Sequence, residues 1–176
     1  MTHKYFEALP YSETLALAKR VCDVVGHGKA GSRVDLIMEV IYWKSLNGNV
    51  KPNKLHRYGI AQLSGEGIKI VQRSKKEKTI HCMALLTKEF FIKLEEVKPI
   101  ELEESPLLSI CFLALISINI SQNIPMARQY GNGEPEGRAE FSVKYGSTVY
   151  DSMEVKNYLN ACSILDAEAE KAALSK

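Results

Sequence analysis

The sequence contains no hydrophobic run long enough to cross a lipid bilayer. Its longest largely apolar stretch covers residues 107–120 and is interrupted by two serines and an asparagine. Its fourteen residues fall short of the ~18 that indicate a membrane-spanning helix. The stretch therefore predicts a buried core helix beginning at Pro106, and we expect no transmembrane segment.

The chain also lacks a strong excess of one charge. Its 23 Lys and Arg and 21 Asp and Glu residues give a formal net charge of +2, which implies no strong field over the surface. The basic run at 73–78 has no interleaved aromatic residues of the kind that stack on bases. We expect a solvated loop there, and nucleic acid is not an expected partner. Residues 1–10 show no apolar core of a signal peptide.

Closely spaced cysteines are missing as well. The four cysteines, Cys22, Cys82, Cys111 and Cys162, form no Cys-x-x-Cys pair, and no histidine lies near them at zinc-finger spacing. Each falls in or beside an apolar stretch, which favours buried free thiols. The sequence leaves one or two disulfides open, and we predict neither a metal site nor a cofactor.

The sequence does have helical periodicity, while the alternation typical of strands is absent. The helix predicted from residue 33 to about 44 is apolar on nearly all sides, which places it in the middle of the domain. With 176 residues, the chain is long enough for one sizeable core. We therefore predict a mainly α single domain over 1–176, with flexible tails at 1–10 and 168–176. Further helices are expected from an N-cap at Ser12 and over 68–72, 79–94, 106–120, 126–130, 138–145 and 152–174, with a loop over 98–105.

Four short motifs follow one another along the chain. Trp-Lys-Ser at 43–45 ends the central helix, and Tyr-Gly-Ile-Ala-Gln follows at 58–62, with its glycine fifteen residues after the lysine. Ala-Arg-Gln-Tyr-Gly-Asn-Gly at 127–133 and Glu-Val-Lys-Asn-Tyr-Leu at 154–159 come later. Together they resemble the soluble lytic transglycosylases and goose-type lysozymes. In that family a helix ends in Glu-Ser, and a Gly-Leu-Met-Gln-like loop follows at the same spacing.

The resemblance implies a lysozyme-like helical fold and cleavage of the β-1,4 bonds of peptidoglycan glycan, with one glutamate as the acid. Lys44 occupies that glutamate's position. An ammonium with a reference pKa of about 10.4 is a poor acid and, at neutral pH, no base. Because general acid–base catalysis contributes about 10²–10⁴ in rate, we expect Lys44 to be an inactive catalytic position. The substrate-binding residues that the resemblance implies are Ser45, Tyr58, Gly59, Gln62, Tyr130 and Tyr158, with Ser45 expected chiefly to fix the geometry of the loop.

Three functions stay open. The first is a catalytically impaired relative that binds peptidoglycan glycan or a protein partner, in a bacterial or phage envelope-crossing machine for secretion, conjugation or injection. The second is an active enzyme with a relocated acid, for which Glu66 is the first candidate, although a solvated turn is the simpler interpretation. Glu39 lies on another side of the helix, about 140° round from Lys44, and is expected to pair with a cation such as Arg33. The third is a cytoplasmic interaction module that no longer binds sugar, so the cell envelope, the virion and the cytoplasm are all open as locations.

Overall fold

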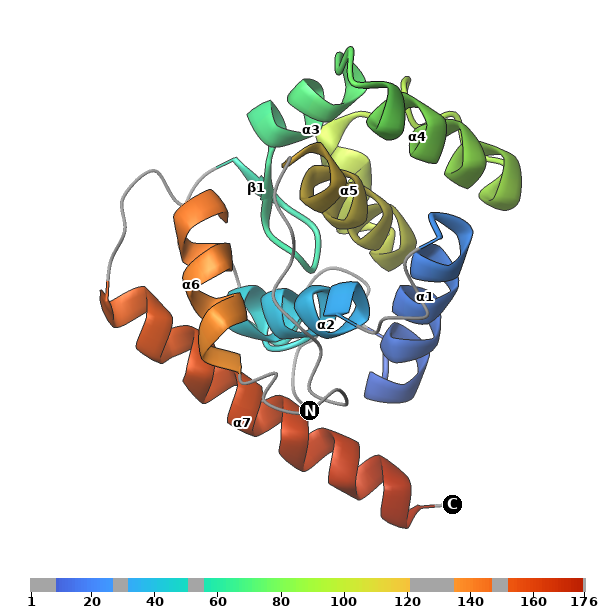
Figure 1. The fold of residues 1–176 in the computed structure, drawn as a ribbon. Coiled ribbons are helices and arrows are strands. Elements are labelled where there is room, and N and C mark those ends of the chain that lie inside the picture. Colours follow the sequence, from blue (N-terminus) through green and yellow to red (C-terminus); the bar gives the residue numbers. More distant parts are fainter. Residues whose placement is uncertain (1–8, 27–31, 51–55, 121–134, 147–151, 176) are drawn as a thin grey trace.

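The computed structural model describes residues 9–26, 32–50, 56–120, 135–146 and 152–175. Within these residues the protein is mainly α-helical, as the sequence predicts, with one two-stranded sheet (Figure 1). The elements in chain order are α1 (Tyr11–Val24), α2 (Ser32–Ser45), β1 (Arg57–Tyr58), β2 (Leu63–Ser64), α3 (Gly65–Gln72), α4 (Glu77–Phe90), the 3-10 helix η1 (Pro99–Glu103), α5 (Pro106–Asn119), α6 (Pro135–Gly146) and α7 (Ser152–Leu174).

Helices α2 and α5 form the centre of the molecule, as their apolar sequences predict (Figure 1). Helix α5 is buried along nearly its whole length and packs against α1, α3, α4 and η1. Helix α2 packs against α1, α5 and α7, and α6 packs on α7. The buried side chains of these helices belong to one contiguous apolar cluster. This arrangement leaves one end of α2 beside the hairpin made by β1 and β2.

The helix ends follow local chemistry, which the sequence predicts in part. Helix α5 begins at Pro106 as expected, and the Ser105 hydroxyl accepts a hydrogen bond from the Leu108 N–H at 3.2 Å. The N-cap predicted at Ser12 is wrong, because α1 already begins at Tyr11, after Pro10. Helix α4 ends four residues before the predicted 94, where Phe91 adopts a left-handed conformation with φ of 56°.

The β1–β2 hairpin is an element that the sequence does not predict. The strands are antiparallel, with Arg57 opposite Ser64 and Tyr58 opposite Leu63. Strands of two residues are too short to show a period of two. The Ser64 side chain then caps α3 by accepting from the Gly67 N–H at 3.0 Å. The motif at 58–62 is therefore a hairpin that leads directly into a helix.

Other expectations have mixed outcomes. Residues 168–174, which the sequence analysis assigned both to the last helix and to a tail, are helical in α7. The 3-10 helix η1 forms where a loop was expected. The helix predicted at 126–130 lies outside the described residues. In the basic run, Lys76 donates to the Asn119 carbonyl at the end of α5, where a cation is favourable for the helix dipole. None of the helices in the described ranges is both long and apolar enough to span a membrane.

Candidate functional site

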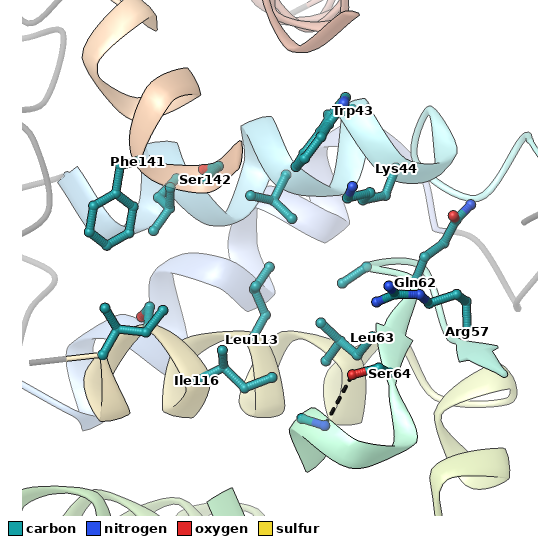
Figure 2. Close-up of a pocket in the computed structure, with 16 residues that line it drawn as sticks. Trp43, Lys44, Arg57, Gln62, Leu63, Ser64, Leu113, Ile116, Phe141 and Ser142 are labelled. Atoms are coloured by element: carbon teal, nitrogen blue, oxygen red, sulfur yellow. Dashed lines mark hydrogen bonds between the residues drawn. The ribbon is translucent and has the colours of Figure 1, made fainter. Parts of the chain in front are cut away.

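A small cleft lies between α2, α5, α6 and the β1–β2 hairpin (Figure 2). Its volume is about 160 Å³. Its wall is mainly apolar and consists of Leu36, Val40, Trp43 and Lys44 from α2, Arg57, Ala61, Gln62, Leu63, Ser64 and Gly67 from the hairpin and α3, Leu113, Ile116, Ser117 and Ile120 at α5, and Phe141 and Ser142 from α6. The motifs at 43–45 and 58–62, which are distant in sequence, therefore meet at one end of the cleft.

Ser45 joins these two motifs from behind the cleft wall. Its side chain is fully buried, and its hydroxyl donates to the Ile60 carbonyl at 2.6 Å while it accepts from the Gly48 N–H at 2.8 Å. These bonds hold the last turn of α2 against the tip of the hairpin. The role expected for Ser45 in fixing the loop is thus present in the structure, although Ser45 itself does not lie on the wall.

Lys44 and Trp43 form the part of the wall that comes from the end of α2. The Lys44 ammonium lies 3.1 Å from the centre of the Trp43 ring, a cation–π contact. The Trp43 indole N–H donates to the Glu154 carboxylate at 3.1 Å, and its ring centre lies 5.4 Å from that of Tyr158. Trp43 thereby connects α2 with α7, and the motif at 154–159 packs behind the motif at 43–45.

On the described part of the cleft wall, the charged side chains are of one sign. Lys44 and Arg57 are the ionised residues among the described residues that line it, and no Asp or Glu of the described ranges does so. Glu66, the candidate relocated acid, is exposed in the first turn of α3 and lies off the wall. The described part of the wall thus offers no carboxylic acid to protonate a leaving group.

Gln62 and Gly59 have different positions in the hairpin: Gln62 lies on the cleft wall, and Gly59 lies behind it. Gln62 lies on the wall and has a left-handed backbone with φ of 47°, and its N–H donates to the Gly59 carbonyl at 2.9 Å. Gly59 is buried away from the wall with φ of 69°. A Cβ added to Gly59 would lie 1.8 Å from the Ser109 Oγ and 2.7 Å from the Leu102 carbonyl oxygen. Gly59 is therefore required for close packing of the hairpin against α5 and η1.

Tyr158 belongs to a buried cluster instead of the cleft. Its side chain is fully buried, and its hydroxyl donates to Glu39 Oε2 at 2.8 Å. Arg138 of α6 donates two hydrogen bonds of 2.8 and 2.9 Å to the same carboxylate. Burial, followed by the charge of Glu39, raises the pKa of Tyr158 well above its ordinary value, so the phenol keeps its proton.

Glu39 pairs with a cation as expected, but the suggested partner Arg33 is wrong. Arg33 is buried and donates from Nε to the Ser117 Oγ at 2.9 Å. The two residues point toward different helices, Arg33 toward α5 and Glu39 toward α6 and α7. The true partner, Arg138, is separated from Glu39 by 99 positions, so no local pattern reveals it.

The structure places the expected catalytic position, Lys44, and the expected binding residues differently. Lys44 and Gln62 lie on the wall, whereas Ser45, Gly59 and Tyr158 are buried behind it. Tyr58 is half-buried in β1 and off the wall. Tyr130 lies outside the described residues. The sequence analysis missed two wall residues of interest, Arg57, whose position just before the second motif was the available signal, and Phe141, which α6 supplies through tertiary packing.

Compared with protein-family models, curated proteins and solved structures, the chain matches none. The resemblance to the lytic transglycosylases therefore depends on the motifs themselves. The structure brings three of them together, since Ser45 bonds Ile60 and Trp43 contacts both Glu154 and Tyr158. This convergence is the structural basis for the proposal that follows.

Proposed function

We propose that this protein is a non-catalytic relative of the lytic transglycosylases that binds peptidoglycan glycan in the cleft without cleaving it. One observation carries the proposal. Lys44, at the position of the family's acid, lies on the cleft wall, and no acidic residue of the described ranges accompanies it there. Enzymes that cleave glycosidic bonds in this way need a carboxylic acid beside the leaving oxygen.

The chemistry of Lys44 argues against a replacement acid. The Lys44 ammonium lies 3.1 Å from the centre of the Trp43 ring, a cation–π contact. A charged ammonium gives up its proton poorly and has no lone pair with which to accept one. The position therefore supplies a fixed positive charge in place of a proton donor.

The wall still offers groups that suit a sugar. Trp43 and Phe141 present aromatic surface, and Gln62 and Ser64 add polar atoms. An apolar wall with a few placed polar groups is typical of small-molecule sites. An enzyme that uses Glu66 has no such support, since Glu66 is exposed and off the wall. We therefore propose binding in preference to relocated catalysis.

The biological setting is part of the proposal and comes from the resemblance alone. We propose a component of a bacterial or phage envelope-crossing machine for secretion, conjugation or injection. In such a machine, a cleft that holds glycan without cutting it would anchor the assembly to the cell wall. A protein partner in the same cleft is the alternative occupant.

Co-sedimentation with purified peptidoglycan tests the proposal, with mass spectrometry of the supernatant to detect released muropeptides. The native chain is expected to sediment with the peptidoglycan and to release nothing. Gln62→Asn keeps an amide and tolerates the left-handed backbone, but it shortens a side chain that lines the cleft and should weaken sedimentation. The control Asn160→Ala, at an exposed position on α7, should sediment like the native chain.

Three results separate the alternatives. Release of 1,6-anhydro products by the native chain would contradict the proposal, and loss of that release in Glu66→Gln would assign the acid. Release of 1,6-anhydro products by the Lys44→Glu variant but not by the native chain would support the proposal. In that case the restored carboxylate would act on glycan that the cleft already holds in the correct position. If the native chain stays in the supernatant, the cleft does not bind glycan, and a protein occupant becomes the better hypothesis.

A further inference from the structure

The positive charge of the chain is concentrated in one segment. Residues 69–93 contain seven Lys and Arg and two Glu, a formal net charge of +5. The rest of the chain has 16 Lys and Arg and 19 Asp and Glu, a formal net charge of −3. All seven cations of the segment are exposed, on α3, on α4 and in the loops that follow these helices. The small overall charge therefore results from a basic edge of the molecule and a more acidic remainder (Figure 1).

The cations at the start of α4 do not stabilise that helix. Lys75 and Lys78 lie within two residues of its N-terminus, where the helix dipole is positive and a cation is unfavourable. Lys76 is different, because it donates to a backbone carbonyl at the end of α5. Glu89, one of the two anions of the segment, is paired with Arg20 at 2.7 Å. The charge at this edge thus suits an anionic partner outside the protein.

The same helix exposes apolar side chains. Ile80, Ala84 and Lys88 follow one another at steps of four residues, so they lie on one side of α4. All three are exposed, and Ile80 keeps 46% of its surface open to solvent. The buried residues of α4 face the other side, where the helix packs against α1 and α5. The outer side of α4 therefore combines aliphatic surface with positive charge.

Phe91 extends this apolar surface at the end of α4. It is 93% exposed, more than any other large apolar side chain of the described residues. Its backbone is left-handed with φ of 56°, a conformation for which glycine is the usual residue because it lacks a Cβ. Phenylalanine at this position strains the backbone and buries almost no surface in the core. Residues that break local rules without benefit to the fold are expected at functional sites. The exposed side chains that share these properties form a surface that we name the α4 face: Lys75, Lys78, Ile80, Ala84, Lys88 and Phe91.

We propose that the α4 face binds the surface of an anionic lipid bilayer. Exposed phenylalanine and aliphatic side chains beside lysines are typical of helices that lie at the boundary between lipid headgroups and acyl chains. The headgroup phosphates attract the lysines, and the upper acyl chains accept Phe91 and Ile80. A bilayer therefore satisfies both components of the face, whereas an acidic protein segment satisfies only the charge. The α4 face shares no residue with the cleft wall, so this inference is independent of glycan binding.

Co-sedimentation of the native chain with lipid vesicles tests the inference. One set of vesicles consists of phosphatidylcholine alone, and in the other set about a third of the lipid is phosphatidylglycerol. Each lysine near an anionic bilayer contributes about fivefold in affinity. The three lysines of the face therefore predict binding to the anionic vesicles that is at least about tenfold tighter than binding to the neutral ones. Added salt should weaken this binding, because it screens the charges.

Two variants separate the apolar and the charged contributions. Phe91→Gly should lower the affinity for anionic vesicles about tenfold, since it removes the most exposed apolar side chain. Its urea midpoint should not fall, because glycine relieves the strain of the left-handed backbone. Loss of binding in this variant therefore cannot result from unfolding. Lys75→Gln combined with Lys78→Gln should lower the affinity at least about tenfold.

The matched controls lie on α7. Leu174→Gly removes an apolar side chain that is 89% exposed at the end of that helix. Lys156→Gln combined with Lys171→Gln removes two exposed cations of the same helix. Both controls should bind anionic vesicles like the native chain. Far-UV circular dichroism checks that each variant is folded.

Each outcome either supports the inference or overturns it. Equal binding of the native chain to the two kinds of vesicle, or full binding by Phe91→Gly, would overturn it. Salt-sensitive binding of polyglutamate without binding to vesicles would also overturn it, and it would assign the α4 face to an acidic protein segment. Phe91→Gly should sediment with peptidoglycan like the native chain, so failure of this inference and failure of the proposed function are recognised separately.

Discussion

The buried pair of Glu39 and Arg138 gives the sharpest prediction about stability. Their side chains are 1% and 0% exposed, and two hydrogen bonds join them. Arg138→Met fills similar space but leaves the Glu39 carboxylate without its cation. Removing one partner of a buried ion pair costs about 3–5 kcal/mol. For a domain of this size, that corresponds to a fall in melting temperature of about 6–20 °C.

Urea unfolding at pH 7, followed by circular dichroism, measures the effect. The matched control is Arg20→Met, since Arg20 and Glu89 form a comparable pair of 2.7 Å with side chains 58% and 41% exposed. An exposed pair contributes about 0–1 kcal/mol. We therefore expect the loss at Arg138 to exceed the loss at Arg20 by at least about 2 kcal/mol.

A double variant isolates the buried charge. Glu39→Leu combined with Arg138→Met removes both charges, so it should be more stable than Arg138→Met alone. If the two single substitutions at Arg138 and Arg20 cost the same, or if the double variant is the least stable, the reasoning is refuted. Because Phe141 on the wall belongs to the same helix as Arg138, the single variant should also weaken glycan binding.

Three further predictions concern the hairpin and the core. Gly59→Ala should lower the free energy of unfolding in urea by about 2–4 kcal/mol, because its Cβ would lie 1.8 Å from a side-chain oxygen of α5. The control Gly65→Ala should be tolerated, since its Cβ would meet nothing closer than 3.5 Å. Equal losses in the two variants would contradict this prediction. Ser45→Ala should cost about 1–3 kcal/mol, since the buried Gly48 N–H and Ile60 carbonyl lose their shared partner, and a cost near zero would argue against the link. Burial raises the pKa of the Cys111 thiol from its ordinary value near 9 to about 12. The unfolded chain therefore loses this proton above about pH 9 while the folded chain keeps it, and the thiol's contribution to stability should fall by about 1.4 kcal/mol per pH unit between pH 9 and 12. Urea midpoints should show that share of the slope vanish in Cys111→Ala but persist in Leu115→Ala, a core truncation in the same helix, and an unchanged slope in Cys111→Ala would contradict the assignment.

Helices buried on all sides could be predicted from sequence, because their apolar runs have no other stable location. Helix α5, which is buried along nearly its whole length, begins at Pro106 as predicted. Helix α7 is largely exposed, and it also has the predicted helix bounds of 152–174. The β1–β2 hairpin could not be predicted, since its strands of two residues are held by Ser45 and by the packing of Gly59. The end of α4 also depends on one left-handed residue, Phe91, which carries no sequence signal for that conformation.

Only those residues of the candidate site that belong to a short sequence motif could be predicted from the sequence. Lys44 and Gln62, which belong to the first two motifs, both line the cleft. The exposure of a tyrosine could not be inferred, and Tyr158 is instead buried on Glu39. The partner of Glu39 and the wall residue Phe141 both come from α6, so they depend on how distant helices pack.

The central claim is that the protein binds glycan in this cleft and does not cleave it. Trp43 is the single tryptophan of the chain and lies on the wall, so its indole N–H gives one diagnostic nuclear magnetic resonance signal. The measurement is a ¹H–¹⁵N titration of the native chain with a peptidoglycan-derived tetrasaccharide. The saccharide is then recovered, and its mass is determined by mass spectrometry. The account predicts that the Trp43 indole and Gln62 side-chain amide signals shift and saturate together, and that the saccharide returns unchanged. Shifts confined to residues away from the cleft, or recovery of 1,6-anhydro fragments, would contradict it.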